Sequence, residues 1–219
     1  MRKIFSDKFC PFCELINKNI ITLGPYPSSP TIKIQKPKIV FQTPNLIVTP
    51  DIAPIVPFHL LAITRMHEVS FLSYFNTPEF NLLKNWVIDY IYKKTTLHPL
   101  IFEHGGCSSI DYSSACIQHA HIHFVPMNHE TKIEILKKIA HELNVSVGKE
   151  NVKNSNYLMI NAIEDNYLFW PDQKNLHQFF RFIISEHFHE VQRHSWQKCL
   201  TNEQIEKSMY WYSLVTVDQ

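Results

Sequence analysis

Three histidines alternate with apolar residues near the middle of the chain, where residues 119–126 read His-Ala-His-Ile-His-Phe-Val-Pro. Side chains of an extended strand point alternately to its two faces. We therefore expect His119, His121 and His123 on one face and the apolar residues between them in a core. A row of imidazoles offers a neutral nucleophile, N–H donors and metal ligands close together. From these residues alone, a metal site, phosphate chemistry and a structural role all stay open.

A second group with chemical potential is the pair Cys10-Pro-Phe-Cys13. Two thiols at this spacing supply half of a tetrahedral zinc site, so two further ligands are needed. The chain has five cysteines, an odd number, and no apolar signal stretch precedes the pair. These features favour a reducing, cytoplasmic location and metal binding rather than a disulfide. A pair of unliganded thiols is the alternative.

Composition limits the partners that we expect. The chain has 219 residues, of which 45% are hydrophobic, enough to bury a substantial core. Its formal net charge is +1, so no broad basic surface indicates a nucleic-acid partner. No apolar run reaches the length of a membrane span, and we expect no membrane partner.

The elements that must position these residues follow from local patterns. Thr77-Pro78-Glu79 supplies an N-cap, a first-turn proline and an early acid, which predicts a helix to about Lys94. Together with the histidine strand, this order predicts an α+β fold, an antiparallel meander sheet carrying a long helix. The strands that we expect before the histidine strand are 38–43, 46–49, 59–64 and 99–103.

The two ends of the chain are less regular in pattern. The segment up to Pro37 is rich in Pro, Ser and Lys, and we expect it to be irregular apart from the cysteine pair. We divide the chain into residues 1–145 and 146–219, the second part being an α/β extension packed on the first. Beyond the histidine strand we expect helices at 130–143 and 174–189 and strands at 157–163 and 166–170.

The pattern His-φ-His-φ-His-φ-φ, where φ is apolar, is the signature of the histidine triad superfamily, and residues 119–125 fill it. Upstream, Asp51-Ile-Ala-Pro and the stretch from His59 to His67 match that superfamily in order and spacing. Over about residues 8–126 the chain resembles the bacterial type that begins with Cys-x-x-Cys. The resemblance implies a histidine-triad-like fold with a C-terminal extension.

The resemblance also implies a reaction. Histidine triad proteins hydrolyse or transfer nucleotides at the α-phosphate through a covalent nucleotidyl-histidine. By position, His121 is the nucleophile, with its ring proton held by the backbone carbonyl of His119. His123 donates to phosphate oxygens, and His59 supports the row from the neighbouring strand. A structural role at the start of its strand is the alternative for His59.

Substrate contacts are implied in the same way. Asp51 matches the carboxylate that accepts both ribose hydroxyls, and Ile52 matches the residue that packs on the base. Asp51 as a turn-forming residue beside prolines is the alternative. The other candidate contacts lie on or near the phosphate loop and are Glu103, Gly105, Ser108, Ser109 and Cys116.

Three positions depart from the nucleotide hydrolases, and one of them is Thr64, which replaces the usual proline after the strand. The loop reads Glu103-His104-Gly105 where they usually have Asn-x-Gly, and Phe-Glu loops of this type occur in the transferase branch. That branch ends its triad with Gln, whereas this chain has His123. Cys116, a poor donor, stands where the hydrolases carry a serine that assists the leaving group. The leaving-group side therefore departs furthest from the family pattern.

The resemblance completes the metal site with His67 and His119, which gives a structural zinc with Cys10 and Cys13. The leading interpretation is a nucleotide hydrolase acting through His121. The alternatives are a nucleotidyltransferase or phosphorylase, a nucleotide-binding protein with little catalysis, and a metallohydrolase with the triad as ligands. Family members commonly form homodimers, and Arg181, on the expected helix, is either an ion-pair partner or a phosphate contact.

Overall fold

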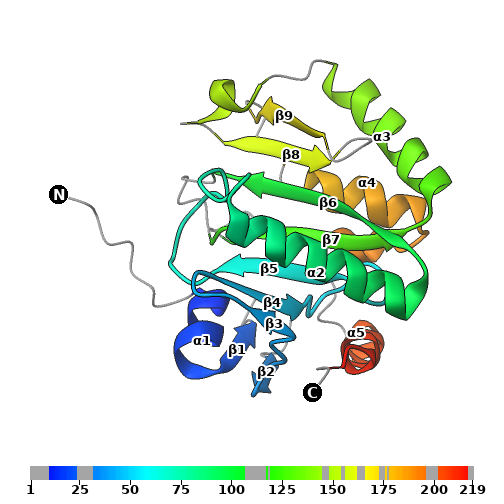
Figure 1. Ribbon diagram of the computed structural model, residues 1–219. Helices are drawn as coiled ribbons and strands as arrows, with labels where there is room; N and C mark the ends of the chain where they lie inside the picture. The colour runs from blue at the N-terminus through cyan, green and yellow to red at the C-terminus, as the bar shows by residue number, and fades with distance from the viewer. Residues whose placement is uncertain are drawn as a thin grey trace.

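The computed structural model describes residues 10–23, 32–106, 117, 119–144, 148–153, 156–161, 166–172, 176, 178–195 and 202–216. Within these ranges, seven strands form one antiparallel sheet in the order β3-β4-β5-β7-β6-β8-β9 (Figure 1). The predicted α+β class with an antiparallel sheet is confirmed. The strands are β3 (Phe41–Gln42), β4 (Leu46–Pro50), β5 (Leu60–Thr64), β6 (His98–Gly105), β7 (His121–Met127), β8 (Tyr157–Asn161) and β9 (Tyr167–Pro171).

The helices begin where the sequence supplies caps. Helix α2 (Pro78–Thr95) begins after Thr77, whose hydroxyl accepts the Phe80 N–H at 3.2 Å. Helix α3 (His129–Leu143) begins after Asn128, whose side chain accepts the Thr131 N–H at 2.7 Å. The remaining helices of the C-terminal third are α4 (Phe179–His187), α5 (Asn202–Leu214) and two 3-10 turns, Lys149–Val152 and Val191–His194. None of the helices in the described ranges is long and apolar enough to cross a membrane.

The N-terminal segment is more regular than its composition suggested. Helix α1 (Pro11–Lys18) is followed by a separate hairpin of β1 (Ile20–Leu23) and β2 (Ile32–Gln35). Our expectation of an irregular segment was wrong for these residues. Cys10 caps the helix through its sulfur, which accepts the Cys13 N–H at 3.4 Å, and a proline occupies the first helical position. The apolar face of α1 is then buried against the sheet, which composition alone does not reveal.

Both faces of the sheet are covered, and the histidines lie on the more open face. From β7, Ile122 and Phe124 pack in the core beneath α2. Val125 points to the opposite face, into a core shared with α3 and α4, and α1 covers Leu61 of β5 on that same side. His121 therefore lies on this second face, between the region covered by α1 and the region covered by α4.

The C-terminal third continues the sheet. Strand β8 pairs with β6, with Phe102 opposite Ile160, and β9 pairs with β8. Helix α4 packs on the face that carries the histidines. Near the C-terminal end, the Tyr90 hydroxyl donates to the carbonyl of Thr216 at 2.8 Å. Residues beyond 156 thus share their cores with the histidine strand.

Candidate active site

The backbone fixes the proton on the central ring of the row. Nδ1 of His121 donates to the carbonyl oxygen of His119 at 2.7 Å. In the neutral ring the proton is then on Nδ1, so Nε2 carries the lone pair. The His121 side chain lines a pocket on the second face of the sheet. This geometry is that of an imidazole ready to act as a nucleophile.

A chain of hydrogen bonds sets the protons on two further rings. The Ile55 N–H donates to Nδ1 of His59 at 3.2 Å, so neutral His59 carries its proton on Nε2. That nitrogen lies 3.0 Å from Nδ1 of His123 and donates to it. The proton of His123 is therefore on Nε2. Burial lowers the pKa of His59 to about 3 and the pKa of His123 well below its ordinary value, which keeps both rings neutral.

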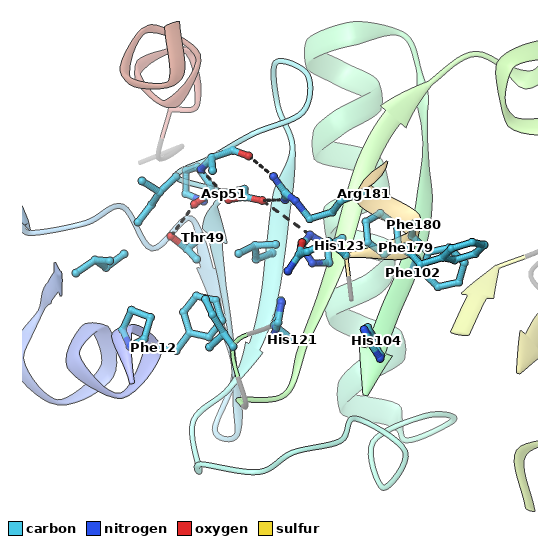
Figure 2. Close-up of a pocket in the computed structure, with 18 residues that line it drawn as sticks. Phe12, Thr49, Asp51, Phe102, His104, His121, His123, Phe179, Phe180 and Arg181 are labelled. Atoms are coloured by element: carbon cyan, nitrogen blue, oxygen red, sulfur yellow. Dashed lines mark hydrogen bonds and ion pairs between the residues drawn. The ribbon is translucent and has the colours of Figure 1, made fainter. Parts of the chain in front are cut away.

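The pocket lies between α1 and α4, and phenylalanine rings stand on both of its sides (Figure 2). Phe12 of α1 stands on one side, and Phe179 and Phe180 of α4 stand on the other. The ring of Phe102 stacks on His123 at a centroid distance of 4.4 Å. No local sequence pattern predicts these walls, because α1 and α4 meet at the pocket only in the folded chain.

Asp51 and Arg181 form a buried ion pair at this pocket. Nη1 of Arg181 donates to Oδ2 of Asp51 at 2.7 Å, and the Ala53 N–H donates to Oδ1 at 2.9 Å. Nη2 of Arg181 also donates to the Ala53 carbonyl at 2.6 Å. Burial alone would raise the pKa of Asp51, but the Arg181 guanidinium holds it below its usual value. Of the two interpretations of Arg181, the structure shows the ion pair (Figure 2).

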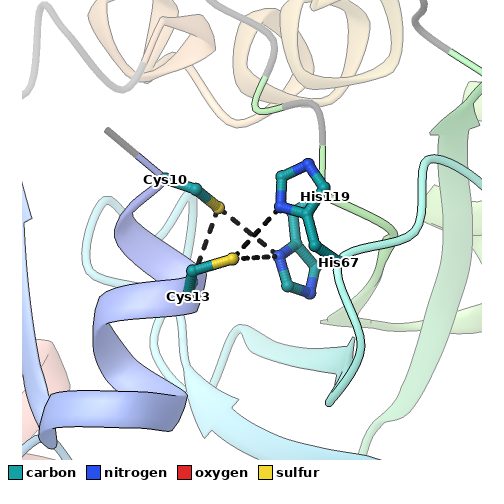
Figure 3. A group of neighbouring side chains, drawn as sticks. All are labelled: Cys10, Cys13, His67 and His119. Atoms are coloured by element: carbon teal, nitrogen blue, oxygen red, sulfur yellow. Dashed lines mark hydrogen bonds between the residues drawn. The ribbon is translucent and has the colours of Figure 1, made fainter. Parts of the chain in front are cut away.

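The predicted metal ligands come together from three separate parts of the chain (Figure 3). The ligand atoms of Cys10, Cys13, His67 and His119 all lie within 4.8 Å of one another. Sγ of Cys13 is 3.1 Å from Nδ1 of His67, and Sγ of Cys10 is 3.4 Å from Nδ1 of His119. Nε2 of His119 donates to the Thr64 carbonyl at 2.7 Å, which turns the Nδ1 lone pair toward the thiols. Two thiols and two imidazoles so arranged fit a zinc ion.

No family model and no curated protein matches this chain, whereas several solved structures do. A Hit-like protein from Bartonella henselae is 17% identical, with 57% of this chain and 82% of that chain covered and a TM-score of 0.40. A zinc-bound histidine triad family protein from Mycobacterium smegmatis is 19% identical, with 55% and 76% covered and a TM-score of 0.34. A HIT family protein from Bacillus anthracis is 17% identical, with 65% and 100% covered and a TM-score of 0.38. The chain is similar to histidine triad proteins.

Not every residue named from the histidine triad resemblance lies in the pocket. Asp51 and Ile52 line it, whereas the Glu103 carboxylate points to the opposite face of the sheet. There it accepts the Tyr157 hydroxyl at 2.5 Å and the Phe71 N–H at 2.9 Å. Strand alternation explains this placement, since the neighbours of Glu103 on β6 face the pocket. Burial raises the pKa of Glu103 to about 7.

Gly105 is needed for packing against Tyr157. A Cβ atom added there would lie 2.3 Å from the ring of Tyr157, so a larger residue would displace that side chain. Ser108, Ser109 and Cys116 lie outside the described residues.

A second group, Asp51, His59 and His123, is also compact enough to hold a cation. Its ligand atoms already have partners, however. Nδ1 of His59 accepts the Ile55 N–H, Nδ1 of His123 faces Nε2 of His59, and Asp51 is paired with Arg181. These contacts make the group a hydrogen-bonded relay. Within the described part of the chain, His119 lies with the thiols and His123 lies with His59. The histidines of the row therefore belong to two different groups, the metal-ligand set and the relay.

Proposed function

We propose that this protein is a nucleotide hydrolase of the histidine triad type. It cleaves at the α-phosphate of a nucleoside phosphoramidate, a dinucleoside polyphosphate or a related nucleotide, and it releases a nucleoside monophosphate. The observation that carries the proposal is the hydrogen bond from Nδ1 of His121 to the His119 carbonyl, which leaves the Nε2 lone pair for phosphorus. A nucleotide is the expected partner, and a homodimer and a cytoplasmic location belong to the same proposal.

The two rings on β7 take complementary parts in this reaction. Nε2 of His121 bonds to phosphorus as the leaving group departs, and water then displaces the histidine. Nε2–H of His123 donates to a non-bridging phosphate oxygen and stabilises the charge that grows there. The relay from the Ile55 N–H through His59 supports this role, because it keeps a proton on that nitrogen.

The ribose and base contacts are proposed for Asp51 and Ile52. Both residues line the pocket. An ionised carboxylate has about four acceptor sites, and Arg181 and the Ala53 N–H use two of them in Asp51. Acceptor capacity for the ribose hydroxyls therefore remains on a carboxylate that is already held in place.

The zinc site is proposed to be structural. Cys10, Cys13, His67 and His119 form a closed set of four ligands, which leaves no coordination position for a substrate water. When bound, the ion supplies folding free energy and joins α1 to the residues before β7. It thereby holds the backbone carbonyl of His119 that fixes the proton on His121.

Turnover measurements test the proposed function. Adenosine 5′-phosphoramidate and diadenosine tetraphosphate are incubated with the wild type, with His121→Ala and with His141→Ala, a matched change at a side chain that is 85% exposed on α3. We expect adenosine monophosphate from the wild type and from His141→Ala. We expect a loss of about 10³-fold or more in His121→Ala, as for the removal of a catalytic nucleophile. Equal turnover in His121→Ala would contradict the nucleophile assignment.

The alternative acceptor is tested in the same assay with added inorganic phosphate. A nucleoside diphosphate as product would favour the phosphorylase or transferase interpretation, to which the loop sequence Glu103-His104-Gly105 is similar. A nucleoside monophosphate in both conditions supports water as the acceptor. Tight nucleotide binding without any product would favour a binding protein with little catalysis.

A further inference from the structure

A histidine–aspartate pair that the mechanism above does not use lies at the same pocket. Nε2 of His104, on β6, is 2.8 Å from Oδ2 of Asp172, which follows β9. The Asp172 side chain is 1% exposed, and the His104 side chain is 13% exposed. The Leu176 N–H also contacts both oxygens of Asp172, at 3.0 and 3.1 Å. The carboxylate is therefore buried and fixed, and the imidazole faces outward from it.

The sheet places this imidazole on the same face and in the same pocket as the proposed nucleophile. The pairing of β6 with antiparallel β7 ends at Phe102 and His123, and His104 follows two residues later on β6, toward the end of β7 at which His121 lies. Alternation keeps Phe102, His104 and the two triad rings on one face. His104 and His121 both line the pocket (Figure 2).

The carboxylate decides which ring nitrogen exchanges protons. Asp172 accepts from Nε2–H of His104, so proton exchange takes place at Nδ1. A buried carboxylate on one nitrogen also stabilises the imidazolium that forms when the other nitrogen takes a proton. This is the arrangement of a general acid–base.

The proposed reaction needs such a group. When the bond from phosphorus to the leaving nitrogen or oxygen breaks, that atom must receive a proton unless it is a stable anion. His121 cannot supply the proton, because its Nε2 bonds to phosphorus and its Nδ1 proton is held by the His119 carbonyl. His123 is buried and its Nε2–H is directed to a phosphate oxygen in the proposed mechanism.

We propose that His104, oriented by Asp172, is the general acid–base for the leaving group and the attacking water. In the first step the Nε2–P bond of His121 forms, the bond to the leaving atom breaks, and the proton on Nδ1 of His104 moves to that atom. In the second step a water oxygen bonds to phosphorus, the Nε2–P bond breaks, and a water proton returns to Nδ1. This assignment rests on the proposed function.

Leaving-group dependence tests the assignment. The wild type, His104→Gln and the matched control His98→Gln, an exposed site on the same strand, are compared on two adenosine 5′-phosphate derivatives. One releases 4-nitrophenolate, a stable anion, and the other releases an alkylamine, which must be protonated. In His104→Gln we expect alkylamine release to fall about 10²–10³-fold. The pre-steady-state burst of 4-nitrophenolate should keep its rate within about threefold, and His98→Gln should match the wild type.

Asp172→Asn provides a second variant in case the glutamine substitution impairs folding. The amide does not stabilise an imidazolium, so alkylamine release should again fall while the 4-nitrophenolate burst is kept. An equal loss of rate with both substrates in the two variants would overturn the assignment. It would mean that His104 and Asp172 only stabilise the packing of β6 and β9. If the wild type shows neither a burst nor turnover, the proposed function falls together with this inference.

Discussion

At the residue scale, backbone groups determine what each imidazole of the site can do. The carbonyl of His119 accepts a hydrogen bond from Nδ1–H of His121, and the N–H of Ile55 orients His59 and, through it, His123. The result is one ring with a lone pair and one ring with a donor, side by side on β7. Burial keeps His59 and His123 uncharged, because it lowers the pKa of both rings.

The relay predicts the effect of removing His59. In His59→Ala, Nδ1 of His123 loses its donor, so the ring is no longer held with its proton on Nε2. We expect kcat to fall about 10- to 100-fold, the usual effect of losing a group that orients a functional histidine, with KM little changed. In His59→Gln an amide N–H can still reach His123, and kcat should be higher than in the alanine variant. Steady-state kinetics measure both, and an unchanged kcat in His59→Ala would contradict the relay.

Glu103 gives a prediction about stability and pH. Burial raises its pKa to about 7 in the folded state from 4.5, so the folded protein binds the proton more tightly than the unfolded chain. Protonated Glu103 therefore contributes to the free energy of unfolding. This contribution should be fully present below about pH 4.5 and should be lost, by about 3 kcal/mol, as the pH rises through 7. Glu103→Gln keeps the hydrogen-bonding shape and removes this dependence.

Urea unfolding at pH 5 and pH 8 measures the effect of Glu103. The wild type should lose stability relative to Glu103→Gln between these values. Glu79→Gln is the control. Desolvation acts to raise the pKa of Glu79, but hydrogen bonds from Asn45 and Thr43 keep this pKa below 4.5. The Glu79 carboxyl is therefore already ionised at pH 5. A parallel response of the wild type and Glu103→Gln to pH would contradict the raised pKa.

The sequence predicted the placement of the histidines on β7 better than the surroundings of the pocket. Strand alternation and family spacing are local signals, and they sufficed to predict that Cys10, Cys13, His67 and His119 lie together and that His121 and His123 share one face. The same rule of alternation, applied to β6, would have predicted that Glu103 points away from the pocket and that His104 points into it. Contacts such as Asp51 with Arg181 join residues 130 positions apart and depend on how α4 packs, which no local pattern encodes.

At the element scale, α1 and α4 complete the site from opposite sides. Helix α1 brings the aromatic ring of Phe12 and two thiols to the end of β7, and α4 brings Arg181. The thiols meet His119 just before β7 begins, so a zinc ion there would hold α1 against the histidine strand. Metal content therefore bears on the geometry of the site.

Zinc analysis gives the prediction for α1. The wild type should contain about one zinc per chain, and the double variant Cys10→Ala/Cys13→Ala should lose most of it, because two imidazoles alone do not close the site. Thermal unfolding should move to a lower Tm in the variant, and a chelator should lower the Tm of the wild type. Cys199→Ser, outside the predicted ligand set, is the thiol control and should keep its zinc. Full zinc content without both thiols would favour a site made from the triad.

At the scale of the whole molecule, the C-terminal third is part of the framework of the candidate site. Strands β8 and β9 extend the same sheet, and Arg181 and Arg193 donate to the segment that contains Asp51, through the carbonyls of Ala53 and Pro54. The pocket is thus closed by residues far apart in the chain. Loss of these contacts should therefore lower the free energy of unfolding of the whole protein.

Arg181→Ala tests this dependence. The substitution leaves the Asp51 carboxylate buried without its guanidinium partner, and we expect the free energy of unfolding to fall by about 3–5 kcal/mol. Asp51→Asn in the same chain removes the stranded charge and should restore part of the loss. Lys18→Ala, which breaks an exposed ion pair with Glu14, should cost about 1 kcal/mol or less. A loss for Arg181→Ala as small as that of Lys18→Ala, measured by urea unfolding, would contradict the dependence.

Mass spectrometry of the trapped intermediate tests the central claim most directly. The protein is mixed with adenosine 5′-(4-nitrophenyl phosphate), quenched at neutral to alkaline pH to preserve the phosphorus–nitrogen bond, digested and analysed by peptide. We predict an adenylyl group on the peptide that contains residues 119–123, located on His121 and lacking in His121→Ala. Turnover without an adduct, or an adduct on another side chain that persists in His121→Ala, would contradict a reaction through the central ring.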